Sequence, residues 1–326
     1  MAEDAGTRAP GTRRTDLTGD DGTWTGLSLE VRSRRRPGLC VFTAERRLLL
    51  AQEARPVLLA AVERDDGGVD FWRTDAYRPP VPPLRARTAR DLAGDPARWA
   101  HRLVSHLLDA PGGPLHDGRW LISPDSPLLR WNHGRLPEAE YWREMLVEGH
   151  PDGYIDWFVH SGSWEILPLR PMPDARDARV RAYRKQARDG TLPPVLLWWV
   201  SGLDCHLVLD GHARLAAAIA ESTAPPLLHL HRTAPDDEVA AGTARAVHVY
   251  ESELARHAEL RAAHGTAVPD GAALAGPVLA RRLHELRTAK RPTWAWPLPG
   301  GEGEWQRVAG EVTGANGWPA DDGPSA

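Results

Sequence analysis

The sequence contains very little cysteine and almost no lysine. Cys40 and Cys205 are too few for a disulfide framework and too far apart for a Cys-x-x-Cys motif. We therefore expect a reducing, cytoplasmic compartment. Of the 40 basic residues only Lys185 and Lys290 are lysine, a bias that is typical of a high-GC bacterial genome. Because no Gly-Lys pair occurs, a Walker A phosphate loop is excluded, and the HExxH and GxSxG motifs are absent too.

The sequence also lacks long hydrophobic runs and a strong excess of charge of one sign. Its longest uncharged apolar stretch, residues 191–203, is far shorter than the ~20 residues that a membrane helix needs. Residues 1–21 are polar and contain no hydrophobic run, so we expect neither a signal peptide nor a membrane partner. The net charge of -4 provides no general attraction for nucleic acid, which we disfavour as a partner.

The length of 326 residues suits two domains, or one core with large additions. Low apolar content predicts disordered tails at residues 1–23 and 315–326. Between the tails we expect an N-terminal α/β or α+β region at 24–150, a core domain at 151–235, and a mainly helical region at 236–314.

Short patterns predict the elements around the core. In the N-terminal region they are strands at 27–31 and 38–42, a helix at 98–108, and a Pro-rich connector at 77–84. In the C-terminal region they are helices at 236–244, 250–263 and 276–288, followed by an irregular Trp- and Gly-rich segment at 294–305.

The core has the clearest pattern. Apolar runs, helical spacing and turn residues predict the order β-α-β-β-α-β, and hence an α+β fold. The elements expected are a strand at 166–170, a helix at 175–188, strands at 194–200 and 205–209 joined by a turn at 202–204, a helix at 211–221, and a strand at 227–231.

The segment Asp210-Gly211-His212-Ala213-Arg214 lies where a predicted strand runs into a predicted helix. Backbone N–H groups at a helix N-terminus are unpaired and favour an anion. Gly211 allows a ligand to approach closely, while His212 and Arg214 offer donors. We expect Asp210 to cap the helix. In the alternative interpretation Asp210 only caps the helix and Arg214 is solvated or ion-paired.

Two motifs in the core resemble those of the ParB/sulfiredoxin-like superfamily. One is a Gly-x-x-x-Pro-[Ile/Val] box, present as Gly190-Thr-Leu-Pro-Pro194-Val195, and the other is a Gly-x-x-Arg box, present as Gly211-His-Ala-Arg214. The resemblance covers about a fifth of the chain and implies a nucleotide or phosphate site at the second box.

Departures from the superfamily narrow that expectation. His212 stands where sulfiredoxin-like members have a reactive Cys, so sulfiredoxin activity is disfavoured. No helix-turn-helix DNA reader follows His231, in contrast to chromosome-partitioning ParB proteins. The most similar pattern is an Asp-Gly-His-His-Arg variant, seen in bacterial proteins that include a branch resembling free-serine kinases, but Ala213 replaces the second His.

The leading functional hypothesis is a protein that binds a nucleotide or another phosphorylated small molecule. The residues assigned to ligand binding are Gly190, Pro194, Gly211, His212 and Arg214, and those assigned to catalysis are Asp210 and His212. If the protein is an enzyme, phosphoryl transfer or nucleotide hydrolysis fits best, with Mg²⁺ bridging Asp210 to the phosphates and with Asp204, Asp210 or Glu165 as the base. One alternative is a non-catalytic sensing or interaction module with a protein partner. A nucleic-acid-binding protein is the second alternative.

Other residue groups carry weaker signals. His229 and His231 share a strand face and could ligate metal with His212 or Asp210, but we favour a solvated strand face, and we predict no metal site. The basic run at 32–36 is expected to be solvated. Fourteen tryptophans are unusual against three phenylalanines, and we expect most of them in the core or at interfaces. Adjacent Trp198 and Trp199 should point to opposite faces of their strand.

Overall fold

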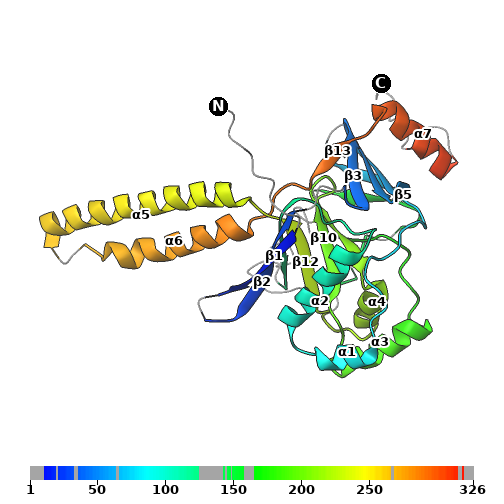
Figure 1. Ribbon diagram of the computed structural model, residues 1–326, viewed down its shortest axis with the longest axis horizontal. Coiled ribbons are helices and arrows are strands. Elements are labelled where there is room, and N and C mark those ends of the chain that lie inside the picture. Colours follow the sequence, from blue (N-terminus) through cyan, green and yellow to red (C-terminus); the bar gives the residue numbers. More distant parts are fainter. Residues whose placement is uncertain are drawn as a thin grey trace.

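The computed structural model describes residues 11–19, 21–32, 36–63, 66–124, 142–143, 145–147, 149–157, 165–265, 268–314 and 318 (Figure 1). These residues form two β-sheets and seven helices, which confirms the predicted α+β class. None of the helices in this part of the chain has the length and apolar content needed to cross a bilayer.

The first sheet has seven strands, and its central and edge strands contain the predicted core. In order across the sheet they are β1 (Gly11–Thr18), β2 (Trp24–Arg32), β7 (Gly118–Ser123), β12 (Leu227–Arg232), β10 (Val195–Val200), β11 (Cys205–Asp210) and β9 (Ile166–Pro168). Strands β10 and β11 form the predicted antiparallel hairpin, β12 runs parallel to β10, and β9 runs parallel to β11.

The second sheet has six strands and is mainly antiparallel. They are β13 (Ala295–Pro297), β3 (Leu39–Ala44), β4 (Arg47–Gln52), β5 (Arg55–Val62), β6 (Gly68–Arg73) and β8 (Asp152–Asp156). The C-terminal strand β13 pairs in parallel with β3, so residues 295–297 join a sheet that is otherwise formed by strands between residues 39 and 156.

The helices differ in how many of their side chains are buried. They are α1 (Ala86–Asp91), α2 (Pro96–Asp109), α3 (Ala178–Arg188), α4 (His212–Ala220), α5 (Asp236–His264), α6 (Gly271–Thr288) and α7 (Gly301–Thr313). Helix α2 buries a full apolar stripe, whereas α5 and α6 project from the rest of the chain as a long hairpin (Figure 1).

The main core lies between the two sheets because alternate strand residues point to opposite faces. In β10, Leu196, Trp198 and Val200 belong to this shared core, while Val195 and Leu197 pack on the other side with α4. The outer face of the second sheet is covered by α7, whose Trp305 is fully buried. Helices and sheets thus form four layers, with α3 and α4 outside the first sheet and α7 outside the second.

Several expectations from the sequence need correction. Residues 11–18, assigned to a disordered tail, form β1, which pairs with β2. The region at 24–150 and the core at 151–235 are not separate, because β2 and β7 continue the core sheet and β8 completes the second sheet. Segment 294–305 is not irregular, since it contains β13 and the start of α7. Residues 1–10, most of the basic run at 32–36, Trp164 and nearly all of 315–326 lie outside the described residues.

Candidate functional site

The Asp210–Arg214 segment forms the junction between β11 and α4. Gly211 is the N-cap and has a φ of 107°, a conformation that favours glycine. The N–H groups of Arg214 and Leu215 both donate to the Gly211 carbonyl, each at 2.8 Å. The prediction that Asp210 caps the helix is wrong, because Asp210 is the last residue of β11 and α4 has no side-chain cap.

Asp210 instead forms an ion pair with Arg214 within the same turn. The side chains are almost completely shielded, with 15% and 2% of their surface exposed. A second guanidinium nitrogen of Arg214 donates to the Pro194 carbonyl at 2.5 Å. Arg214 therefore links the two boxes of the sequence motif. The structure supports the ion-paired interpretation of this residue.

Burial and the ion pair act in opposite directions on Asp210. Loss of hydration raises the pKa of the Asp210 carboxyl above its usual value, although the Arg214 guanidinium partly opposes this effect. Because Asp210 is engaged by Arg214, it does not present a free carboxylate to a ligand.

A cavity of about 270 Å³ opens at this end of α4. Its walls come from the Pro-rich segment at 78–84, from Arg170 after β9, from Arg179 and Tyr183 of α3, and from the Asp210–Arg214 segment. The Pro-rich segment is neither helix nor strand, as predicted. The wall that it provides was not predicted from the sequence.

Three arginines besides Arg214 line the cavity. Arg78 donates to the backbone carbonyls of Asp75 and Tyr77, while Arg170 and Arg179 form no ion pair with any carboxylate among the described residues. The cavity thus combines a helix N-terminus with guanidinium groups from three separate segments, an arrangement that favours an anion.

His212 is a buried polar side chain at the same cavity. Only 2% of its surface is exposed, and its Nε2 has no hydrogen-bond partner among the described residues. Burial, followed by the charges of Arg170, Arg214 and Arg73, lowers the pKa of His212 to about 3. The imidazole is therefore neutral near pH 7 and can donate one N–H.

Tyr77 is a fully buried neighbour of His212 that does not itself line the cavity. Its hydroxyl donates to the Leu209 carbonyl at 2.6 Å, and its ring centroid lies 6.3 Å from that of His212. Burial, followed by the charge of Asp210, raises the pKa of Tyr77 well above its ordinary value, so the hydroxyl stays protonated. Tyr77 holds the end of β11 in place.

The other predicted site residues lie further away. Gly190 is exposed after α3 with a φ of 66° and does not line the cavity, and Pro194 contributes only its carbonyl to Arg214. Glu165 and Asp204, the candidate bases, do not line it either. Burial, then the charge of Asp156, raises the pKa of Glu165 to about 7.

The residues present do not fit the Mg²⁺ expected beside Asp210. Within the described ranges no group of three or more His, Cys, Asp or Glu side chains could hold a metal ion. The Asp210 carboxylate is already neutralised by Arg214. No chemical step through a metal follows from this arrangement.

The expectation that His229 and His231 are solvated is wrong. Both are buried in β12, which lies between β7 and β10. The rings of His206 and His229 lie 5.2 Å apart, and His231 Nε2 contacts the Thr288 carbonyl at 3.1 Å. Trp198 enters the shared core and half-buried Trp199 packs under Lys290, as the alternation predicts.

Sequence reasoning missed the arginines that complete the cavity. Arg78 was assigned to a connector, Arg170 to a strand end, and Arg179 was not distinguished from the exposed face of α3. The signal that could have pointed to them is the number of basic residues close to the two boxes. In a chain this rich in arginine, however, such a number does not stand out.

Comparisons with protein families, with curated proteins and with solved structures gave no match for this chain.

Proposed function

We propose that this chain binds the phosphate group of a small molecule, such as a nucleotide, in the cavity at the N-terminus of α4, within a ParB/sulfiredoxin-like core. The observation that carries the proposal is the convergence of Arg78, Arg170 and Arg179 on a helix N-terminus without a carboxylate partner among the described residues. Arg170 is half-buried and Arg78 and Arg179 are exposed, so their guanidinium groups form a positive rim around the cavity mouth, which attracts an anion.

His212 supports the same conclusion. A buried imidazole nitrogen without a partner costs free energy, and a bound phosphate oxygen would accept its N–H. The phosphate would also reduce the arginine repulsion that lowers the pKa of His212. The binding groups are then His212, Arg170, Arg179 and the first backbone N–H groups of α4.

The size of the cavity narrows the ligand class. A volume of about 270 Å³ is just below the ~300–1,000 Å³ typical of pockets that enclose a whole drug-sized ligand. This volume favours a compact phosphorylated compound, or a nucleotide of which mainly the phosphate end enters. We restrict the proposal to binding, because the candidate bases Glu165 and Asp204 do not line the cavity. A ligand-sensing role therefore fits better than phosphoryl transfer.

Calorimetry and thermal-shift measurements on the full chain would test binding. The panel contains inorganic phosphate, sugar phosphates, and nucleoside mono-, di- and triphosphates with and without Mg²⁺. Arg170→Gln and Arg179→Gln should each weaken the best ligand about tenfold or more, because each removes a charge-assisted hydrogen bond of about 1.5–3 kcal/mol.

The matched control is Arg181→Gln, which changes an exposed arginine of α3 that does not line the cavity. It should bind like the wild type. If no phosphate compound stabilises the protein, or if all three variants bind equally well, the proposal is wrong.

A further inference from the structure

The hairpin of α5 and α6 is a surface that the phosphate site does not explain. The two helices contact each other more than any other element, and their only buried residues are Val239 and Gly271. Most of the hairpin therefore extends into solvent (Figure 1). Two helices alone rarely bury enough apolar surface to be stable, because helix stability in proteins comes mostly from tertiary packing.

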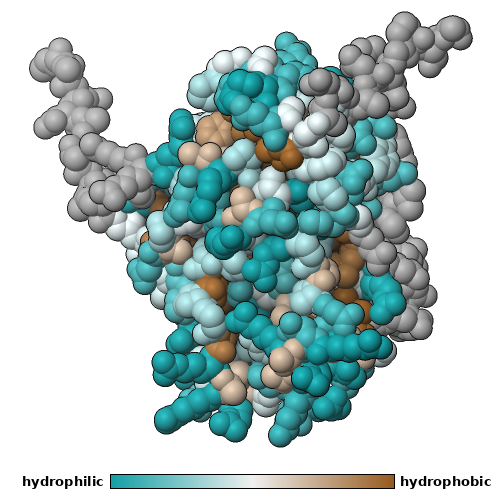
Figure 2. Space-filling model, turned by 90° about the vertical axis from the view of Figure 1, so that its right-hand side faces the viewer, coloured by the Kyte–Doolittle hydropathy of each residue, from teal (hydrophilic) through white to brown (hydrophobic). Residues whose placement is uncertain are grey.

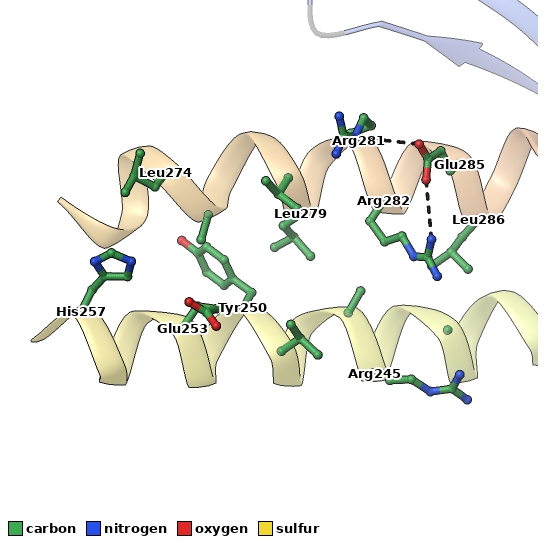
Figure 3. Close-up of a pocket in the computed structure, with 15 residues that line it drawn as sticks. Arg245, Tyr250, Glu253, His257, Leu274, Leu279, Arg281, Arg282, Glu285 and Leu286 are labelled. Carbon is green, nitrogen blue, oxygen red and sulfur yellow. Dashed lines mark ion pairs between the residues drawn. The ribbon is translucent and has the colours of Figure 1, made fainter. Parts of the chain in front are cut away.

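An open groove of about 590 Å³ runs between the two helices (Figure 3). Three of its apolar side chains are about half exposed: Val249 at 56%, Leu274 at 51% and Val278 at 55%. The face of the molecule that points away from the hairpin has only small, separate hydrophobic patches (Figure 2). An apolar groove of this size on a projecting hairpin indicates a docking surface.

Of the charged residues that line the groove, those of α6 pair with one another, Arg281 and Arg282 with Glu285. The two on α5 are spaced evenly about Val249. Arg245 lies four residues before it and Glu253 four residues after it, and both line the groove. Each is therefore ~6 Å from Val249 along the helix axis. Arg245 makes no ion pair among the described residues, while Glu253 pairs only with exposed Arg256 of the same helix, at 2.7 Å.

The charges of α5 are arranged so that two copies of this helix can be complementary to each other. If a two-fold axis passes close to Val249, then Arg245 of one copy faces Glu253 of the other, and the reverse pair forms as well. Val249 of one copy would then meet Val249 of the other at the centre of the contact, with one ion pair on each side.

We propose that a second copy of this chain covers the groove, and that the two hairpins form an antiparallel four-helix bundle about this axis. The shorter helix, α6, has 18 residues and is ~27 Å long, and a pair of helices is ~20 Å wide. The contact area is then on the order of 500 Å² per copy, or about 1,000 Å² in total, near the lower limit for a specific interface. The dimer should be weak and depend on protein concentration.

Sedimentation equilibrium of the full chain would measure the dimer and its charge pairs. Val249→Glu and Arg245→Glu should each raise the dissociation constant at least tenfold. The double variant Arg245→Glu/Glu253→Arg should return the dissociation constant to the wild-type value, because the swapped charges again face each other across the axis. Glu251→Arg, an exposed position outside the groove, is the control and should dimerise like the wild type.

Disulfide cross-linking would test the position of the axis. Val249→Cys should form a covalent dimer under mild oxidation, since the native Cys40 and Cys205 are buried. Leu260→Cys, also exposed, should not, because its two copies would lie ~33 Å apart, far beyond the ~7 Å limit for a disulfide.

Three results would overturn the proposal. The first is a chain that remains monomeric at about 100 µM, where a contact of this area should be populated. The second is a dimer that Val249→Glu leaves unchanged, and the third is equal cross-linking at Val249 and Leu260. Circular dichroism of each variant separates loss of dimer from loss of fold.

Discussion

The ion pair between Asp210 and Arg214 has little access to water, so removing one partner leaves a buried charge. We expect Arg214→Ala to lower the free energy of unfolding by about 3–5 kcal/mol. The loss has two causes, since Asp210 loses its cation and the Pro194 carbonyl loses its donor. Urea denaturation at pH 7 would measure it.

The double variant Asp210→Asn/Arg214→Leu should recover part of this loss, because it removes both charges together. Arg181→Ala, at an exposed position of α3, should change the stability by at most about 0.5 kcal/mol. If Arg214→Ala costs no more than Arg181→Ala, the pair does not hold the two boxes together.

Buried histidines should make the fold sensitive to acid. Burial lowers the pKa of His116 and His231 to about 4 and that of His212 and His229 to about 3. Because the unfolded chain binds these protons near pH 6.5 and the folded chain does not, stability is complete above that value and falls as the pH decreases towards 4. In this window each of these histidines should lower the free energy of unfolding by about 1.4 kcal/mol for each unit by which the pH falls. Urea denaturation at pH 7, 6 and 5 would give the slope.

Replacing one of these histidines should reduce the slope. The four histidines take up protons on unfolding, and Glu165, whose pKa is raised to about 7 in the folded chain, offsets this uptake in part by releasing one. His229→Leu is expected to remove one histidine proton from the balance, whereas His248→Gln, at an exposed position, should leave the slope as it is. A stability that stays constant between pH 7 and 5 would contradict this prediction.

Strands and helices with strong local patterns could be predicted from the sequence. The apolar run of β10, the return strand β11 and the stripe of α4 each carry their own signal, so the order β-α-β-β-α-β follows from short windows. The contact between the two boxes could be anticipated in part, because both boxes resemble motifs of one superfamily. The role of Arg214 in that contact depends on tertiary structure.

Elements that depend on distant partners could not be predicted. Strand β1 has almost no apolar residues, and it forms because β2 offers a free edge. Three C-terminal helices were predicted, but the structure has two in their place, α5 and α6, because α5 continues without a break through residues 245–249. The cavity arginines were missed for the same reason, because Arg78 and Arg170 come together with α4 only in the folded chain.

The whole molecule divides into a layered body, which contains the proposed phosphate site, and the projecting hairpin. The base of the hairpin is attached by ion pairs from Arg119 to Asp236 and from Arg291 to Glu238. A hydrogen bond also joins His231 to the Thr288 carbonyl. All of these contacts lie at the ends of α5 and α6, so the two proposed functions can be separated by a deletion.

Replacing residues 240–285 by a Gly-Ser linker of about four residues should leave the body folded, because such a linker can span the ~10 Å between adjacent helices. We expect the midpoint of thermal unfolding to change by only a few degrees, since Gly271 is the single buried residue among the described residues of the deleted part. Affinity for the phosphate ligand should stay within about twofold, because no deleted residue lines that cavity. Sedimentation should show a monomer at every concentration. A deleted protein that still dimerises would refute the hairpin interface and leave the phosphate site intact, whereas one that folds and no longer binds phosphate would show that the hairpin contributes to the site.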